Sequence, residues 1–137
     1  MIGARTVGAA TRAIEEAVDF AANRIQGGGP LVGHQLIQAM LADSKAEIYA
    51  ARSMVLEAAR KRDGGASITL EASCAKLFGA EMVGRVADRA VQIHGGAGYM
   101  QASVVERLYR DVRLFRLYEG TSQIQQLVIA RHMLRGD

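Results

Sequence analysis

The hydrophobic residues of this chain recur at alternating steps of three and four over long stretches. This spacing stacks side chains on one face of an α-helix. Three stripes follow it: Val7, Ala10, Ile14, Ala17 and Ala21; Ile37, Leu41, Ser44, Ile48, Ala51, Val55 and Ala58; and Ala75, Phe78, Met82, Val86, Ala90 and Ile93. No alternating strand pattern of useful length interrupts them, so the sequence predicts an all-α fold.

Glycine clusters and the single proline mark where these helices end. Residues 27–30 end the first helix, and residues 63–65 end the second. The third helix is expected to run from about Ser67 to Ile93, because the glycines of residues 95–98 force a break. The connections are short, which favours antiparallel packing of neighbouring helices.

Two further helix starts are predicted by capping-box patterns, in which two side chains bind the free N–H groups of the first turn. Ser103 with Glu106 begins a short helix that reaches about Val112. Ser122 with Gln125 begins the last helix. The expected fold is therefore an antiparallel bundle of four main helices plus a short one.

Length and composition predict a single domain with no membrane span. The chain has 137 residues, and charged residues interrupt every apolar run before the roughly 18 residues that a span needs. The N-terminus lacks the apolar core of a secretory signal. We therefore expect a cytoplasmic protein. Its long alanine-rich stripes predict association into a homo-oligomer, a dimer or a tetramer.

Several kinds of site are not expected. The single cysteine, Cys74, has no partner in the chain and is expected to be a buried structural thiol. His34, His94 and His132 lack the paired spacing of a zinc site, so we expect no metal. The 17 basic residues are scattered among 14 acidic ones, which is not typical of a surface that binds nucleic acid.

Two features could carry chemistry. One is the glycine-rich turn at residues 95–98, where a flat ligand or another backbone can approach closely. The other is Glu119, which lies on a loop before a helix start. A plain turn and a carboxylate that complements the helix dipole are the more frequent explanations of such features. Taken alone, they leave the function open.

The exact residues around these features resemble the acyl-CoA dehydrogenase family. The segments that carry the resemblance are Gln92-Ile93-His94-Gly95-Gly96, Glu106-Arg107, Tyr109-Arg110-Asp111 and Tyr118-Glu119-Gly120-Thr121-Ser122-Gln123. Weaker agreement follows upstream in the same order, at Val7-Gly8, Arg12-Ala13, Arg24, His34-Gln35 and Ala75-Lys76. The resemblance implies that residues 1–137 form the family's C-terminal helical bundle domain, without its N-terminal helical and middle β-domains.

The resemblance also implies roles for individual residues. Glu119 would be the base that removes the α-proton of an acyl-CoA, as in the medium- and short-chain members, while Tyr118 and Gly120 would line the acyl pocket. The hydride would pass to FAD, giving a trans-2-enoyl-CoA. The residues implied in FAD contact, some of them reaching the flavin of a neighbouring subunit, are Arg24, Gln26, His34, Gln35, Gln92, Ile93, His94, Gly95, Gly96, Thr121, Ser122 and Gln123.

The sequence departs from the family in its first half. A phenylalanine and a glycine often follow Arg24 at the third and fourth places, where Gly27 and Gly28 stand here, and Gly33 replaces a common glutamate. On the fourth helix, Arg107, Arg110, Asp111 and Arg113 are interpreted as an ion-pair network. These four are not assigned to catalysis.

Three readings of function remain open. An acyl-CoA dehydrogenase would pass its electrons to an electron-transfer flavoprotein. An acyl-CoA oxidase shares the fold and the glutamate but passes them to oxygen. In the third reading the chain alone is a non-catalytic helical module that assembles with complete subunits. Because most of the flavin surface lies in the middle β-domain, we expect the isolated chain neither to retain FAD nor to turn over acyl-CoA.

Overall fold

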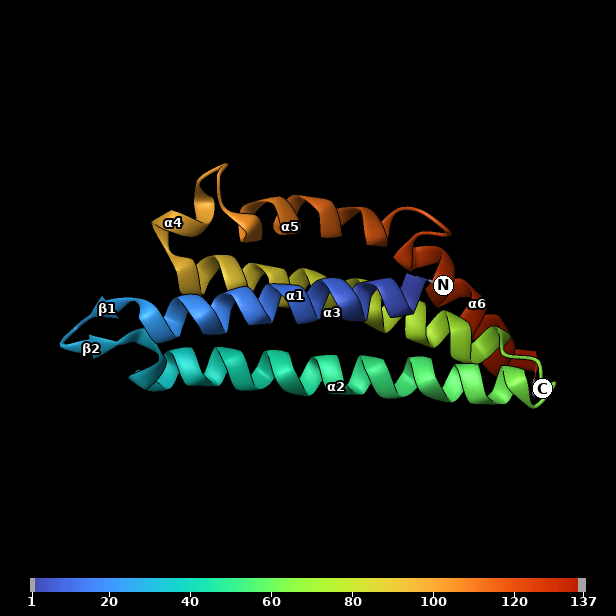
Figure 1. The fold of residues 1–137 in the computed structure, drawn as a ribbon. Helices are drawn as coiled ribbons and strands as arrows, with labels where there is room; N and C mark the ends of the chain where they lie inside the picture. The colour runs from blue at the N-terminus through green and yellow to red at the C-terminus, as the bar shows by residue number, and fades with distance from the viewer. Residues whose placement is uncertain (1, 136–137) are drawn as a thin grey trace.

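The computed structural model describes residues 2–135, which form a bundle of helices (Figure 1). Three long helices lie side by side with alternating direction: α1 (Ile2–Asn23), α2 (Gln35–Asp63) and α3 (Thr69–His94). Three shorter ones follow: α4 (Gly96–Tyr99), α5 (Val104–Val112) and α6 (Ser122–Arg135). The predicted all-α antiparallel bundle is confirmed, and both chain ends lie at the same end of it.

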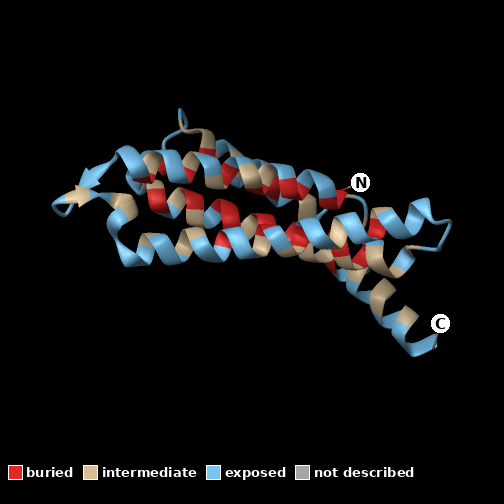
Figure 2. Ribbon diagram, turned by 60° about the horizontal axis from the view of Figure 1, so that its bottom comes forward, coloured by how far each residue is buried: buried red, intermediate tan, exposed pale blue. Residues whose placement is uncertain are grey.

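The core lies where α1 and α3 pack against each other, with α2 along one side (Figure 2). It is built mainly from small side chains, and Ala10, Ala13 and Ala21 of α1 are completely buried. Small residues let the helix backbones approach closely. At the tightest point a Cβ on Gly79 would lie 2.4 Å from Thr6 Oγ1. The stripes predicted from the sequence all face this core.

A short hairpin joins α1 to α2, where the sequence predicted no strands. Its strands, β1 (Ile25–Gln26) and β2 (Gly29–Pro30), are antiparallel and have two residues each. Gly27 and Gly28 form the turn with φ of +64° and +91°, the backbone of a type I′ turn. Strands this short show no alternating pattern, so only the glycine pair signalled them. The 3₁₀ turn Leu31–Gly33 then leads into α2.

The break after α3 falls at Gly95, as the sequence predicted. Gly95 adopts φ +58° and ψ −139°, a conformation open to glycine but not to L side chains. The following residues do not form a plain turn, however, because Gly96–Tyr99 make the single helical turn α4. Gly98 packs closely there, since a Cβ would lie 2.8 Å from Val91 O.

Neither predicted capping box forms. Ser103 precedes α5 without a side-chain cap, and the Glu106 carboxylate accepts a 2.6 Å hydrogen bond from Arg110. At α6 the cap is Thr121, whose Oγ1 accepts the Ile124 N–H at 3.3 Å. Both helix starts were predicted close to their observed positions, but the side chains bind other partners.

Helix α6 packs against α3 and leaves most of its surface exposed (Figure 2). Ser122 is its only buried residue within the described chain. Its large apolar residues include Ile124, Leu127 and Leu134, which are 48%, 51% and 87% exposed. That face is therefore apolar but uncovered in this chain. No helix in residues 2–135 is both long and apolar enough to cross a membrane.

Candidate active site at the Glu119 loop

The loop at residues 117–121 connects the 3₁₀ turn Arg113–Arg116 to α6. Glu119 has φ +55°, and among residues 2–135 it is the only non-glycine residue with positive φ. Gly120 follows with φ +83°. A left-handed conformation costs a glutamate about 1 kcal/mol or more and persists only where its surroundings hold it. The exposed Glu119 carboxylate therefore sits on a strained backbone.

Two side chains hold this backbone in place. Lys76 of α3 is buried, and its Nζ donates a 2.6 Å hydrogen bond to Gly120 O. Gln125 Nε2 donates to Glu119 O at 3.2 Å and to Gly120 O at 3.4 Å. Glycine is needed at residue 120 for its φ of +83°; a Cβ there would lie 2.7 Å from Gln125 Nε2, the far end of a flexible side chain that would have to shift.

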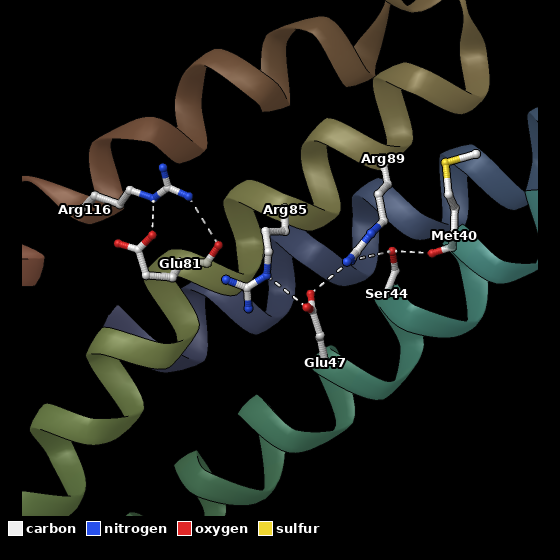
Figure 3. A network of polar contacts seen from close by, with 7 residues as sticks. All are labelled: Met40, Ser44, Glu47, Glu81, Arg85, Arg89 and Arg116. Carbon is white, nitrogen blue, oxygen red and sulfur yellow. Dashed lines mark hydrogen bonds and ion pairs between the residues drawn. The ribbon is translucent and has the colours of Figure 1, made fainter.

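Glu81, also on α3, anchors both sides of the loop. Ser122 Oγ donates a 2.7 Å hydrogen bond to Glu81 Oε1. On the other side Arg116 Nε lies 3.1 Å from Glu81 Oε2, and Arg116 also reaches the Glu81 backbone oxygen at 3.4 Å (Figure 3). One helix thus fixes the residues before, within and after the loop.

A pocket of about 240 Å³ opens beside Glu119. Its walls come from α1, α2 and α3 and are largely apolar, with Ile2, Val55 and Ile68 among them, while Lys76, Glu119 and Gln125 supply the polar groups. Burial lowers the pKa of Lys76, and the Glu81 and Glu119 carboxylates oppose this shift. A carboxylate and an ammonium thus share one apolar pocket, an arrangement suited to removing a proton from a bound ligand.

A larger cavity lies elsewhere, between α3 and α5. It measures about 690 Å³, and five arginines line it: Arg85, Arg89, Arg110, Arg113 and Arg116. Four of these are already paired. Arg85 and Arg89 pair with Glu47 at 2.9 and 3.0 Å, and Arg116 pairs with Glu81 (Figure 3). Arg110 pairs with Glu106 of its own helix. Most of its positive charge is therefore compensated, and we do not take it as the active site.

The predicted ion-pair network on α5 is smaller than expected. Of Arg107, Arg110, Asp111 and Arg113, only Arg110 forms an ion pair within residues 2–135, and its partner is Glu106 on the same helix. Cys74 is half-buried instead of fully buried. Burial and the nearby Glu71 raise the pKa of its thiol, which disfavours the reactive thiolate.

The residues predicted to contact FAD fall into two groups at opposite ends of the bundle. Thr121, Ser122 and Gln123 lie beside Glu119 at the end where α6 begins. The other group lies at the hairpin end and consists of Arg24, Gln26, His34, Gln35 and the segment Gln92 to Gly96. Lys76 and His94 are 18 residues apart on α3, so the two ends are separated by about 27 Å.

The residues at the hairpin end differ in how accessible they are. Arg24, Gln26, His34, Gln35 and Gln92 are exposed. A Cβ at Gly95 or Gly96 would meet no atom within 4 Å, so a ligand can approach the backbone there. Ile93 is only 4% exposed, and its side chain belongs to the core. His94 is half-buried and stacks on Phe20 with ring centroids 4.2 Å apart.

Sequence reasoning missed the side chains that hold the Glu119 loop. Lys76 was noted only as part of a family resemblance, and Glu81 was not singled out. A signal was present for Lys76: it lies three residues after Ser73 and four before Ala80, two residues on the buried face of α3. A lysine within such a stripe must find a partner in the interior.

Comparison with known proteins agrees with this architecture. The family profile described as "Acyl-CoA dehydrogenase, C-terminal domain" matches residues 1–134. A probable acyl-CoA dehydrogenase of Bacillus subtilis, YngJ, is 48% identical over 134 residues, covering 98% of this chain and 35% of the relative. The chain thus spans about a third of the length of the curated relatives that it matches.

Solved structures show the same fold. Butyryl-CoA dehydrogenase from Megasphaera elsdenii superposes with a TM-score of 0.96 at 39% identity, over 98% of this chain and 35% of that one. A structure described as the FAD complex of PigA superposes with a TM-score of 0.92 at 27% identity, over 98% of this chain and 35% of that one. The chain therefore belongs to the acyl-CoA dehydrogenase family, whose C-terminal domain it matches.

Proposed function

We propose that this chain is the C-terminal domain of an FAD-dependent acyl-CoA dehydrogenase, in which Glu119 is the base that removes the α-proton of an acyl-CoA thioester. The observation that carries the proposal is the strained Glu119 backbone, held by Lys76 and Gln125 so that the carboxylate stands beside an apolar pocket. Backbone strain at a polar group is typical of a functional site. In the complete enzyme an N-terminal helical domain and a middle β-domain precede this bundle.

The reaction needs a carboxylate at this position. The α-hydrogen of a thioester is only weakly acidic, so a positioned base must accept it as the β-hydrogen leaves as hydride. Tyr118 and Gly120 flank the base in the sequence, and we infer that they contact the acyl chain, although neither lines the pocket of about 240 Å³. A backbone N–H of the loop polarises the thioester carbonyl oxygen and so acidifies the α-carbon. Substrate lying over Glu119 excludes water from the carboxylate and strengthens it as a base.

FAD supplies the hydride acceptor when it is bound, because no side chain can take up a hydride. The accessible residues suit such a group. Gly95 and Gly96 leave their backbone open, and the exposed guanidinium of Arg24 suits a pyrophosphate. Gln26, His34, Gln35, Gln92 and His94 offer polar groups at the same end, and Ile93 can contribute only its backbone. Thr121 and Gln123 offer side-chain groups beside the base, whereas Ser122 is buried with its hydroxyl bound to Glu81 and can contribute only its backbone.

The separation between the FAD-contact candidates at the Glu119 loop and those at the hairpin end supports a homo-oligomer. Because about 27 Å of α3 lies between the loop and the hairpin end, we infer that each flavin is held by the loop of one protomer and the hairpin end of another. Dimers or tetramers both satisfy this arrangement. The exposed apolar face of α6 offers a surface for such contacts. An electron-transfer flavoprotein is the proposed electron acceptor.

Two alternatives remain. An acyl-CoA oxidase would use the same loop and the same base, with oxygen as acceptor. The exposed face of α6, with Leu127 at 51% and Leu134 at 87%, specifically favours the other alternative, a helical module that assembles with complete subunits. In either case we expect the chain on its own to bind no FAD tightly. A yellow, active preparation of the chain alone would contradict that expectation.

The test uses a full-length acyl-CoA dehydrogenase whose C-terminal third is this sequence. Anaerobic bleaching of its flavin is measured with a series of acyl-CoAs for the wild type, Glu119→Gln and the control Glu57→Gln, an exposed glutamate of α2. Bleaching by the wild type and the control but not by Glu119→Gln supports the assignment. Equal bleaching by all three would show that Glu119 is not the base. Hydrogen peroxide formation in air would identify an oxidase.

A further inference from the structure

We propose that Lys76 is a positioning residue for the Glu119 carboxylate, one that acts through the backbone of Gly120 without touching the substrate's reacting atoms. The inference rests on the proposed function of Glu119. It concerns a residue on a different helix, separated by 44 positions in the sequence from the carbonyl that it binds.

The first argument is the cost of burying a lysine. Lys76 is only 6% exposed, and an ammonium in the interior loses hydration that an apolar side chain of the same length would not need. If filling space were its only role, methionine would serve at lower cost. The charge is therefore retained for its partner, and within residues 2–135 the only hydrogen-bond acceptor of Lys76 Nζ is Gly120 O.

The second argument is the position of the Gly120 carbonyl, which lies next to Glu119 in the chain. Gly120 directly follows Glu119, and both residues have positive φ, so a hydrogen bond that holds the Gly120 carbonyl restrains the backbone from which the Glu119 side chain projects. Gln125 reaches the same oxygen only at 3.4 Å, against 2.6 Å for Lys76. Charged hydrogen bonds are both shorter and stronger than neutral ones. Lys76 is thus the stronger of the two restraints on the Gly120 carbonyl, while Gln125 also binds the Glu119 carbonyl at 3.2 Å.

The third argument is the location of Lys76 on the pocket wall. Lys76 and Glu119 both line the cavity of about 240 Å³, so Lys76 stands beside the space that the proposed base faces. A purely structural anchor would not need to face the pocket. This location also means that a small amine can enter the space left when the side chain is removed.

The experiment compares Lys76→Met with Lys45→Met, an exposed lysine of α2, in the same full-length enzyme. We expect the first-order rate of anaerobic flavin reduction to fall about 10- to 100-fold in Lys76→Met, the loss that a displacement of about 1 Å can cause. The dissociation constant for acyl-CoA and the FAD content should stay close to those of the wild type. Lys45→Met should match the wild type in the rate of flavin reduction, the dissociation constant for acyl-CoA and the FAD content.

A second variant separates positioning from folding. In Lys76→Ala, ethylammonium chloride should restore flavin reduction several-fold, whereas sodium chloride at equal ionic strength should not. An unchanged rate of flavin reduction in Lys76→Met would overturn the proposal. It would also be overturned if both variants lost FAD and ethylammonium failed to restore flavin reduction in Lys76→Ala. If Glu119→Gln bleaches normally, the proposed base is wrong. If Glu119→Gln is inactive while Lys76→Met is fully active, only this inference fails.

Discussion

Ser122 and Glu81 are joined by a 2.7 Å hydrogen bond that links the first residue of α6 to the middle of α3. Because Ser122 is the only buried residue of α6 within the described chain, this contact is the main polar attachment of that helix. A hydrogen bond to a charged group contributes about 1.5 to 3 kcal/mol. Its removal should therefore be measurable in the stability of the whole chain.

Ser122→Ala is expected to lower the free energy of unfolding by about 1 to 2 kcal/mol, because the Glu81 carboxylate keeps Arg116 but loses its second partner. Urea titration followed by circular dichroism measures the change. Ser53→Ala is the control, since Ser53 is exposed and binds only the Tyr49 carbonyl of its own helix. Equal effects of the two substitutions would contradict the role given to Ser122.

Gly79→Ala and Gly84→Ala should differ although both lie within α3. A Cβ at residue 79 would lie 2.4 Å from Thr6 Oγ1, and α1 and α3 would have to separate. We expect a loss of about 1 to 3 kcal/mol from this overpacking. At residue 84 the close atom is at the far end of the flexible Arg116 side chain, which can shift, and the better helix propensity of alanine offsets that displacement. Thermal melting of both variants decides the comparison.

Glu119→Gly and Glu119→Ala should separate function from strain. Both remove the carboxylate, so neither should reduce flavin if Glu119 is the base. Glycine accepts φ +55° without penalty, whereas alanine does not. We expect Glu119→Gly to be about 1 kcal/mol more stable than Glu119→Ala. Equal melting temperatures would indicate that the loop relaxes and that the left-handed conformation is not imposed by its neighbours.

Glu47 should make the bundle sensitive to acid. Burial raises the pKa of Glu47, but hydrogen bonds from Arg89 and Arg85 outweigh this and leave it below 4.5. The unfolded chain therefore binds the proton more readily, and the stability from this group is complete above pH 4.5 and is lost as the pH falls through the lower, folded-state pKa.

Glu47→Gln should accordingly cost about 1 to 2 kcal/mol at pH 7, between the values for exposed and buried ion pairs. The difference from the wild type should shrink as the pH is lowered below 4.5, because the wild-type carboxylate then becomes protonated as well. Urea titrations at a series of pH values measure this. A difference that is constant with pH would exclude a titrating ion pair at this position.

The sequence predicted the helices well because their burial follows a regular period. Ile48 and Ala51 of α2, like Met82 and Val86 of α3, are buried where the spacing placed them. The side-chain partners at helix ends were predicted poorly. Ser122 satisfies a capping pattern with Gln125, but the folded chain offers it the Glu81 carboxylate, 41 residues away in sequence. Local patterns contain no information about such a competitor.

The same limit applies to the site. The sequence singled out Glu119 through a family resemblance, and nothing in its local pattern predicted the left-handed backbone that presents the carboxylate. That backbone depends on Lys76, which only the tertiary structure brings to Gly120. Residues that act directly can be recognised from a motif, whereas those that orient them are distributed over other helices.

The 26 residues of α3 carry Lys76 near one end and His94 at the other. In a continuous helix, inserting a single residue between them would turn one relative to the other by about 100° and move them apart by about 1.5 Å. Neither change could be absorbed locally, because Gly79 leaves no room against Thr6. The length of this helix therefore sets both the distance and the relative rotation of the two groups of site residues. We expect insertions and deletions to be tolerated in the hairpin at residues 25–30 but not between residues 76 and 94.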